Sequence, residues 1–432
     1  MKILHTVEFY APSVGGAQQV VRQLSERLVQ RGHAVTVATT ALPERKAKTI
    51  NGVRIEEFEI SGNVVRGFRG EQSEIERYQE FLINSDFDVM LNYAAQQWTM
   101  DLIFPVIDRI PYRKIMIPCG FSGLYEPAYQ EYFINMPTVM RGYDHLVFHA
   151  DDYRDTNFAR QHHIEHFSII PNGASETEFA RVDGAFRERY RIPDDVPILL
   201  TVGSHTSLKG HRLCLEAFQR LDIQRAILVI IGNVFTSPGG WRRFARSVWS
   251  ELRSRNVSQA IKMLLRAMFG GIAPGCLPDD RMRSRWINLK GLGKKRVLLL
   301  DPPRADVLAA YQAADLFIFG SNVEYSPLVL YEAVASRTPF VSLACGNAAE
   351  IAAWTGGGVV APTLQKEHGY VDGDAEIFAQ IIADLLVDQP KRKNLSDVGY
   401  HTWAKKFTWD EIVSRYEELY SFVLGAENVE SV

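Results

Sequence analysis

Two successive series of alternating strands and helices constrain the fold of this chain more than any other feature. In the first series, Lys2–Phe9 has the pattern of a buried strand, an amphipathic helical pattern begins at Gly15–Gly16, and Ala34–Thr40 is the next strand. Strands joined by helices in this way pair in parallel, with helices on both faces of the sheet. Further strands of this series are expected at Val53–Ile60, Phe87–Tyr93, Lys114–Pro118, His145–His149 and Phe167–Ile170.

The alternation begins again at Ile198–Gly203, after a polar stretch with turn signals at Asn172–Gly173 and Pro193–Asp195. We therefore expect an α/β protein with two doubly wound, Rossmann-like domains that face each other across a cleft. Its active site is expected at the carboxyl ends of the strands. The expected divisions are an N-terminal domain over 1–175, a linker over 176–197, a C-terminal domain over 198–400 with a basic helical insert at 236–290, and a C-terminal helix over 401–432 that returns to the first domain.

Composition favours a cytoplasmic protein without a metal or disulfide framework. No stretch approaches 18 consecutive apolar residues and a strand follows Met1 directly, so we expect neither a membrane span nor a cleavable signal. The four cysteines form no Cys-x-x-Cys pair, which argues against disulfides and a zinc site. Two acid pairs stand at the start of a strand and in a loop, so we expect no catalytic metal; these are Asp86 with Asp88 and Asp372 with Asp374.

The stretch Ser321–Ala335 places Glu324 and Glu332 eight residues apart across an expected strand-to-helix turn. Ser326 has the chemistry of a helix N-cap, and Pro327 that of a first helical residue. The free amides and positive dipole end of such a helix suit a diphosphate, and a glutamate further along is placed to accept hydrogen bonds from a ribose. The alternative is a surface helix with a capped start and a solvated glutamate.

Several motifs, taken in order, resemble those of the glycosyltransferase family 4 enzymes, which have the two-domain GT-B fold. The residues that carry the resemblance are Gly15–Gly16, Ile170–Ala174, Gly203–Gly210, Glu324–Glu332 followed by Ala333–Pro339, and Gly346 with Glu350. The resemblance covers the chain except for the basic insert. It implies transfer of a sugar from a nucleotide-diphosphate donor, with retention of anomeric configuration and without a metal or other cofactor.

The resemblance also implies roles for individual residues. The catalytic residues would be Glu324, which contacts the donor sugar, and Lys209, which contacts the phosphates, while Glu332 would bind the ribose. The implied donor-binding residues are Gly203, Ser204, Lys209, Glu324, Ser326, Pro327, Leu328, Val329 and Glu332. The implied acceptor-side residues are Gly15, Gly16, Cys119 and Gly120. The alternatives are that the glycines only start a helix and that the lysine is solvated.

Two positions depart from the family pattern. Ser204 stands five residues before the lysine, where many relatives have an arginine, and Cys119 stands where many have a histidine. A serine hydroxyl does not replace a bidentate phosphate clamp, so a compensating cation is expected. The candidates are His205, His211, Arg212 and Arg304. A thiol is also a poorer hydrogen-bond donor than an imidazole, so another residue is expected to take over that role, or turnover is modest.

Residues Trp241–Arg296 carry 14 basic side chains against three acids, although the whole chain has a formal charge of −3. Apolar residues at helical spacing predict two basic amphipathic helices over 241–269. Helices of this kind bind anionic membrane surfaces, where a lipid-linked acceptor is found. A lid packed on the second domain is the alternative. Nucleic acid is not an expected partner, because the rest of the chain is acidic.

The sequence therefore predicts a cytoplasmic glycosyltransferase, peripheral on the inner face of the membrane, that acts on a glycan or lipid-linked acceptor. The expected setting is synthesis of a cell-surface polysaccharide or glycolipid. Two alternatives stay open. One is a GT-B nucleotide-sugar epimerase or hydrolase, and the other is a non-catalytic protein that binds a sugar nucleotide.

Overall fold

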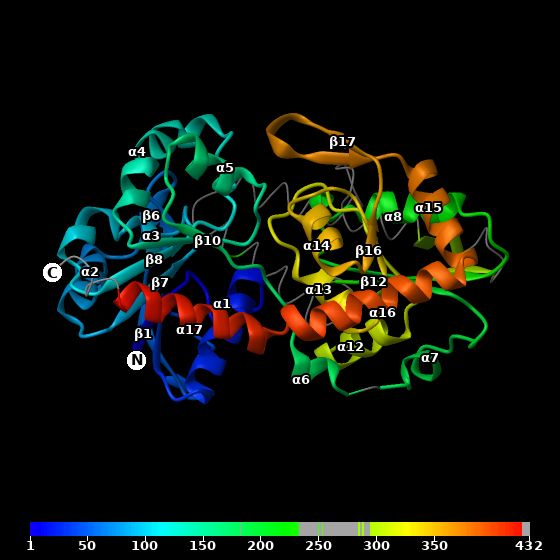
Figure 1. Cartoon of the computed structure of the whole chain (residues 1–432), viewed down its shortest axis with the longest axis horizontal. Coiled ribbons are helices and arrows are strands. Elements are labelled where there is room, and N and C mark those ends of the chain that lie inside the picture. The colour runs from blue at the N-terminus through cyan, green and yellow to red at the C-terminus, as the bar shows by residue number, and fades with distance from the viewer. Residues whose placement is uncertain are drawn as a thin grey trace. The chain divides into compact units, whose positions relative to one another are not determined.

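A computed structural model describes residues 1–181, 183–232 and 294–425, with a few isolated positions between 249 and 288. The chain divides into two compact units (Figure 1). The first consists of Met1–Ala174, Tyr325–Leu328 and Lys406–Val432, and the second of Ser175–Glu324 and Val329–Lys405. The basic insert expected at 236–290 lies outside the described residues, apart from those isolated positions.

The first unit is built on an eight-stranded sheet in the order β10-β9-β8-β7-β1-β2-β4-β3. All neighbours pair in parallel except β3 and β4. The strands are β1 (Lys2–Thr6), β2 (Ala34–Thr40), β3 (Thr49–Ile50), β4 (Val53–Phe58), β7 (Val89–Tyr93), β8 (Arg113–Ile117), β9 (His145–Phe148) and β10 (Phe167–Ile169). The strand order reverses between β1 and β7, which places the natural binding crevice at the carboxyl ends of these two strands.

Helices cover this sheet because their apolar residues recur at helical spacing. In α1 (Gly16–Gln30), Val20, Val21, Leu24 and Leu28 are buried. The other helical elements of this unit are α2 (Gln72–Asn84), α3 (Trp98–Asp101), η1 (Phe104–Arg109), η2 (Pro127–Tyr129), α4 (Gln130–Arg141), α5 (Arg154–Gln161) and α17 (Trp409–Gly425). A two-stranded hairpin of β5 (Ser61–Asn63) and β6 (Gly67–Arg69) completes the unit.

The C-terminal helix α17 belongs to the core of the first unit. Its residues Trp409, Ile412 and Tyr416 are buried in one hydrophobic cluster with residues of β1, β2 and α1. Arg31 at the end of α1 also donates to the Asp410 carboxylate at 2.6 Å. The last part of the chain therefore completes the first unit.

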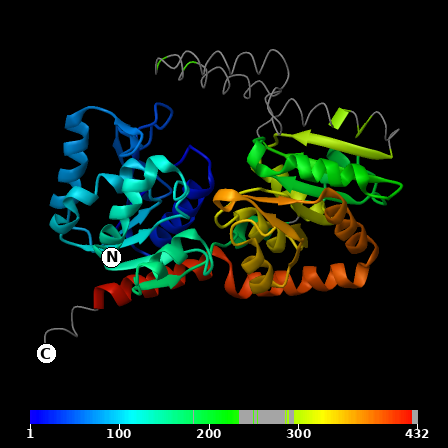
Figure 2. The ribbon, with the colours of Figure 1, turned by 90° about the horizontal axis from the view of Figure 1, so that it is seen from above.

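The second unit has a six-stranded, fully parallel sheet in the order β13-β12-β11-β14-β15-β16. Its strands are β11 (Ile198–Val202), β12 (Ala226–Ile231), β13 (Lys295–Leu300), β14 (Leu316–Phe319), β15 (Phe340–Ser342) and β16 (Gly358–Val360). In Figure 2, β13 is the lime-green arrow at the edge of this sheet. The order reverses between β11 and β14, so the loops after these two strands flank the expected ligand crevice.

Among the described residues of the second unit, the helical elements are η3 (Ser207–Lys209), α6 (Glu176–Phe179), α7 (Phe186–Arg189), α8 (His211–Arg220), α12 (Arg304–Ala313), α13 (Leu328–Ala335), α14 (Ala348–Thr355), η4 (Glu367–Gly369), α15 (Ala375–Val387) and α16 (Gln389–Lys406). A hairpin pairs β17 (Thr363–Gln365) with β18 (Val371–Gly373). The stretch 176–197, expected as a linker, carries α6 and α7 and belongs to this unit. No helix in the described ranges is long and apolar enough to cross a membrane.

Candidate functional site

The loops after β11 and β14 approach each other closely at two glycines. Gly210 has a φ of +63°, and a Cβ atom at this position would lie 1.7 Å from the carbonyl oxygen of Gly320. Only glycine fits here, since the backbone conformation and the space both exclude a side chain. The turn Ser207–Lys209 is thereby held against the end of β14.

Hydrogen bonds between the two loops fix this approach. The Leu208 carbonyl accepts from the Ser321 hydroxyl at 3.0 Å and from the Asn322 amide at 2.8 Å. The result is that Lys209 Nζ donates to Glu324 Oε1 at 2.6 Å. The Ser321 hydroxyl donates to the same carboxylate oxygen at 2.8 Å. The two residues expected to be catalytic therefore meet, at the strand ends where the topology reverses.

This pair is accessible as well as organised. The Lys209 side chain is 32% exposed and that of Glu324 is 14% exposed. The lysine ammonium therefore remains within reach of an anionic ligand, while the carboxylate is oriented by two donors. Gly203, expected at the donor site, lies beside this lysine, since a Cβ atom there would be 3.6 Å from the Lys209 side chain.

Glu332, the expected ribose ligand, lies on α13. It forms an ion pair with Arg304, one of the four residues considered as a compensating cation. Arg304 Nη2 donates to Glu332 Oε1 at 2.5 Å and to Glu178 Oε2 at 2.8 Å. Burial opposes the charged form, yet the carboxylates of Glu332 and Glu178 raise the pKa of Arg304. The arginine is therefore permanently charged and lies directly beside the Glu332 carboxylate.

The other candidate cations occupy different places. The Arg212 Nε donates to Glu216 within α8 at 3.0 Å. Burial lowers the pKa of His211 to about 3, so this ring is neutral near pH 7, and it lies 3.1 Å from the Gly203 carbonyl. The His205 ring is next to it, with 4.8 Å between the ring centroids. Ser204 uses its carbonyl to accept from the Thr206 amide at 2.8 Å.

The helix α13 begins at Leu328, so Pro327, which has the chemistry of a first helical residue, directly precedes it. The buried Ser326 hydroxyl has no hydrogen-bond partner among the described residues, and so it does not cap the helix. The Ser326 carbonyl instead accepts from Asn172 Nδ2 at 3.2 Å. The loop before Leu328 is therefore held by its backbone. The amides of Leu328 and Val329 remain the predicted diphosphate ligands.

On the acceptor side, the two glycines after β1 have ordinary geometry. Gly15 is extended, with a φ of −171°, and α1 begins at Gly16. A Cβ atom on Gly16 would meet nothing within 4 Å, whereas one on Gly15 would meet only the flexible end of Gln18. Their role in allowing close approach of substrates stays a prediction.

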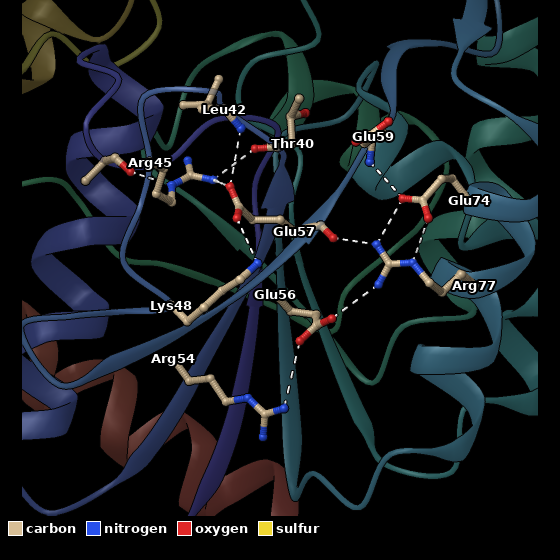
Figure 3. Close-up of polar contacts among 11 residues, drawn as sticks. Thr40, Leu42, Arg45, Lys48, Arg54, Glu56, Glu57, Glu59, Glu74 and Arg77 are labelled. Atoms are coloured by element: carbon tan, nitrogen blue, oxygen red, sulfur yellow. Dashed lines mark hydrogen bonds and ion pairs between the residues drawn. The ribbon is translucent and has the colours of Figure 1, made fainter.

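Arg45 anchors the start of this β1–α1 loop, and sequence reasoning missed it. Its Nε donates to the Ala11 carbonyl at 2.7 Å and its Nη2 to the Tyr10 carbonyl at 3.0 Å. Figure 3 shows its guanidinium facing Glu57 on β4, with an Nη1–Oε1 distance of 2.6 Å. The Arg45 side chain is 1% exposed. Nothing in the sequence marked this arginine, because its partners are carbonyls and a carboxylate remote in the chain.

Cys119 and Gly120 form a tight turn after β8, with φ values of 62° and 87°. Burial and the nearby Asp155 carboxylate raise the pKa of the Cys119 thiol to about 12. The thiol is therefore protonated at neutral pH, which excludes it as a nucleophile under those conditions. The Gly120 amide donates to Asp155 Oδ2 at 2.7 Å.

Asp155 itself is a second residue that the sequence did not mark. It lies in the first turn of α5, is 0% exposed, and accepts from the Gly120 and Thr156 amides. Burial raises its pKa from 3.8 to about 6. The carboxylate therefore carries its charge at neutral pH inside the first unit, next to the Cys119–Gly120 turn.

The acid pairs judged unsuited to a metal have other contacts. The Asp86 and Asp88 carboxylates accept from Lys2, through its Nζ and its amide respectively. Asp374 caps α15 by accepting from the Glu376 and Ile377 amides. Within the described ranges, no three His, Cys, Asp or Glu side chains gather as metal ligands would.

The raised pKa of Asp155 predicts the pH dependence of its contribution to stability. Its charged form is disfavoured on folding, so a penalty develops as pH rises from about 4 to about 6 and is complete above that range. A change from 3.8 to about 6 corresponds to about 3 kcal/mol. Asp155→Asn should therefore gain stability relative to the unmodified protein by up to about this amount between pH 4 and pH 7, measured by urea denaturation.

Asp374→Asn is the matched control, because the Ile377 and Glu376 amides lower the pKa of Asp374. Its stability relative to the unmodified protein should change with the opposite sign, falling as pH rises. A flat or falling difference for Asp155→Asn would show that burial does not penalise this charge.

Comparison with known proteins agrees with this architecture. A profile of the family described as "Glycosyl transferases group 1" matches residues 183–402, which is half of the chain. The D-inositol 3-phosphate glycosyltransferase of Xylanimonas cellulosilytica is 23% identical over 98% of this chain and 95% of its own length. A protein of the same name from Corynebacterium aurimucosum is 30% identical over 60% of this chain and 58% of its own length.

Solved structures show the same fold across nearly the whole chain. A sucrose-phosphate synthase from Thermosynechococcus elongatus superposes with a TM-score of 0.70 at 17% identity, over 98% of this chain and 99% of that one. Anabaena Alr3699/HepE in complex with UDP-glucose superposes with a TM-score of 0.66 at 14% identity, over 98% and 99%. These likenesses confirm the GT-B class with two Rossmann-like domains. The chain thus belongs to the group 1 glycosyltransferases, the family that its motifs resemble.

Proposed function

We propose that this glycosyltransferase takes its sugar from a nucleotide-diphosphate donor and transfers it with retention, without a metal. The observation that carries the proposal is the Lys209–Glu324 pair, held at 2.6 Å at the switch point of the second sheet. Support for the donor class comes from Anabaena Alr3699/HepE, which is described in complex with UDP and with UDP-glucose. Retention rests on the resemblance to family 4.

The residues divide the work of binding and leaving-group stabilisation. Glu332 accepts hydrogen bonds from the ribose hydroxyls, with Arg304 fixing its carboxylate at 2.5 Å. Lys209 and the amides at Leu328 and Val329 bind the diphosphate. As the glycosidic bond breaks, negative charge grows on this diphosphate, and donors already in place stabilise it without reorganisation. The proposal needs no metal ion because these groups are cationic or donors.

Glu324 in this scheme orients the donor sugar through its hydroxyl groups. Binding of the diphosphate draws Lys209 toward the phosphates, and the Glu324 carboxylate then exchanges its lysine partner for sugar hydroxyls. The Ser321 hydroxyl, 2.8 Å away, keeps this carboxylate in place during the exchange. The pairing therefore holds both side chains in the site before the donor arrives.

We propose a glycan or lipid-linked acceptor at the inner face of a membrane, because the basic, apolar pattern of 241–269 suits an anionic membrane surface. This stretch lies outside the described residues except for isolated positions. The relatives that act on D-inositol 3-phosphate, and the neighbour named as a sucrose-phosphate synthase, add phosphorylated polyols and sugars to the acceptors worth testing.

Nucleotide binding gives the first test. UDP, GDP, ADP, CDP and dTDP are added singly, and the melting temperature of the intact protein is recorded. One of them should raise it by several degrees, because ligand at 100 times its Kd adds about 2.7 kcal/mol. Glu332→Ala should weaken the binding by roughly 10- to 100-fold, the value of one or two hydrogen bonds to a charged group.

Glu178→Ala is the control for this variant, because Glu178 also binds Arg304 at 2.8 Å but has no proposed contact with the nucleotide. If both variants lose the same amount of nucleotide affinity, the loss is caused by a change at Arg304 and not by a lost contact with the ribose. If no nucleotide shifts the melting temperature, the donor site is assigned wrongly.

Turnover gives the second test. Lys209→Met should lower kcat for nucleotide release by on the order of 100- to 1,000-fold, because the leaving diphosphate loses its cation. Lys405→Met on the exposed face of α16 is the control and should leave kcat unchanged. Mass spectrometry of the products and NMR of the new linkage identify transfer and its stereochemistry.

The same product analysis decides between the proposal and the two alternatives. Donor consumed without any acceptor product would indicate an epimerase or hydrolase. Bound nucleotide without any turnover would indicate a sugar-nucleotide-binding protein, in keeping with Ser204 and Cys119 at positions where relatives carry an arginine and a histidine.

A further inference from the structure

Glu324 and Tyr325 are neighbours in the sequence but pack in different units of the chain. Glu324 belongs to the second unit, whereas Tyr325–Leu328 belongs to the first unit. The motif that carries the expected donor ligands therefore passes through the first unit for four residues before Val329 returns it to the second. Tyr325 is the first of these four residues.

The hydroxyl group of Tyr325 has two partners inside the first unit. It accepts a hydrogen bond from the His149 amide at 2.9 Å and donates one to the Asp155 carboxylate. His149 is 1% exposed and Asp155 is 0% exposed. Burial and the Asp155 charge raise the pKa of Tyr325 well above its usual value, so the hydroxyl stays protonated and able to donate.

The ring of Tyr325 is held as firmly as its hydroxyl. Its centroid lies 5.2 Å from that of Tyr153 and 5.6 Å from that of His149, with both pairs tilted. Gly120 packs against the same ring, since a Cβ atom there would lie 2.9 Å from it. The ring thus fills a space that the Cys119–Gly120 turn leaves open.

One buried carboxylate joins these contacts. Asp155 accepts from the Gly120 amide at 2.7 Å and from the Tyr325 hydroxyl, so it holds the expected acceptor-side turn and the residue next to Glu324 together. Hydrogen bonds to a charged acceptor are about twice as strong as those between neutral groups. A buried charge is costly, and a plain packing role for Tyr325 would not require it.

We infer that Tyr325 is a positioning residue, whose bonds to Asp155 and His149 set the place of the Glu324 carboxylate in the donor site. The inference rests on the proposed function, because Glu324 is assigned there to the donor sugar. An enzyme loses activity when one of its catalytic groups is displaced by about 1 Å. The loop between β14 and α13 contains no helix or strand that would hold Glu324 in place, so a side-chain anchor is needed.

Tyr325→Phe tests the inference, because it removes the hydroxyl and keeps the ring. Tyr112→Phe is the matched control: the Tyr112 hydroxyl is also buried and bonded, to the Leu82 carbonyl at 2.8 Å. It precedes β8, at the opposite end of the strand from the Cys119–Gly120 turn. Thermal denaturation of both variants monitors the general effect of losing a hydrogen-bonded hydroxyl group on stability.

The first readout is amide hydrogen exchange in the full chain. The His149 amide donates directly to the Tyr325 hydroxyl, so peptides covering 145–150 and 320–328 should exchange faster in Tyr325→Phe and not in Tyr112→Phe. The second readout is kinetic, with UDP and UDP-glucose as probes. UDP affinity should stay within about twofold in Tyr325→Phe, while kcat falls by on the order of 10- to 100-fold.

If amide exchange is unchanged in Tyr325→Phe, Tyr325 does not anchor the loop, whatever the activity of the variant. Faster exchange with unchanged kcat overturns the positioning role, and a loss of UDP affinity equal to the loss of kcat does the same. If the intact protein neither binds UDP nor turns over UDP-glucose, the proposed function with this donor fails, and the exchange comparison still decides whether Tyr325 anchors the loop.

Discussion

The close approach of Gly210 to Gly320 is the constraint on which the candidate site depends. A single Cβ atom at Gly210 would overlap the facing carbonyl, at 1.7 Å, so the two loops meet only because this position is glycine. Once they meet, Leu208 bonds to the residues after β14, and Lys209 reaches Glu324. The parallel sheet supplies the rest, because it brings the ends of β11 and β14 to one edge where the strand order reverses.

Paired charges then set the chemistry of this edge. Glu324 is paired with Lys209 and Glu332 with Arg304, so each of the two carboxylates expected in the donor site is held by a cation. These pairings keep the four side chains in the site before a ligand arrives, and Lys209 then exchanges Glu324 for the diphosphate. In the first unit, the fully buried Asp155 carboxylate has amide and hydroxyl donors instead of a cation, and it holds a turn and a tyrosine rather than a substrate.

Much of the fold could be predicted from the sequence, because the buried strands of a parallel sheet are recognisable as largely apolar stretches. The strand expected at Ala34–Thr40 coincides with β2, and the second series begins at Ile198 as expected, with β11. The ion pair between Lys209 and Glu324 could be predicted only through the family resemblance, since the two residues lie 115 positions apart in the sequence. Arg45, Asp155 and the pairing of Arg304 with Glu332 were not foreseeable, because each depends on partners that only the folded chain brings together. Ser326 has the chemistry of an N-cap, yet its hydroxyl does not cap α13, because it has no hydrogen-bond partner among the described residues.

The most direct test of the account is a crystal structure of the protein with UDP-glucose bound. We expect the ribose hydroxyls to lie within hydrogen-bond distance of Glu332 and the glucose hydroxyls at Glu324. The diphosphate should lie at Lys209 and the first amides of α13. A nucleotide bound elsewhere, or one whose sugar makes no contact with Glu324, would contradict the assignment of the donor site.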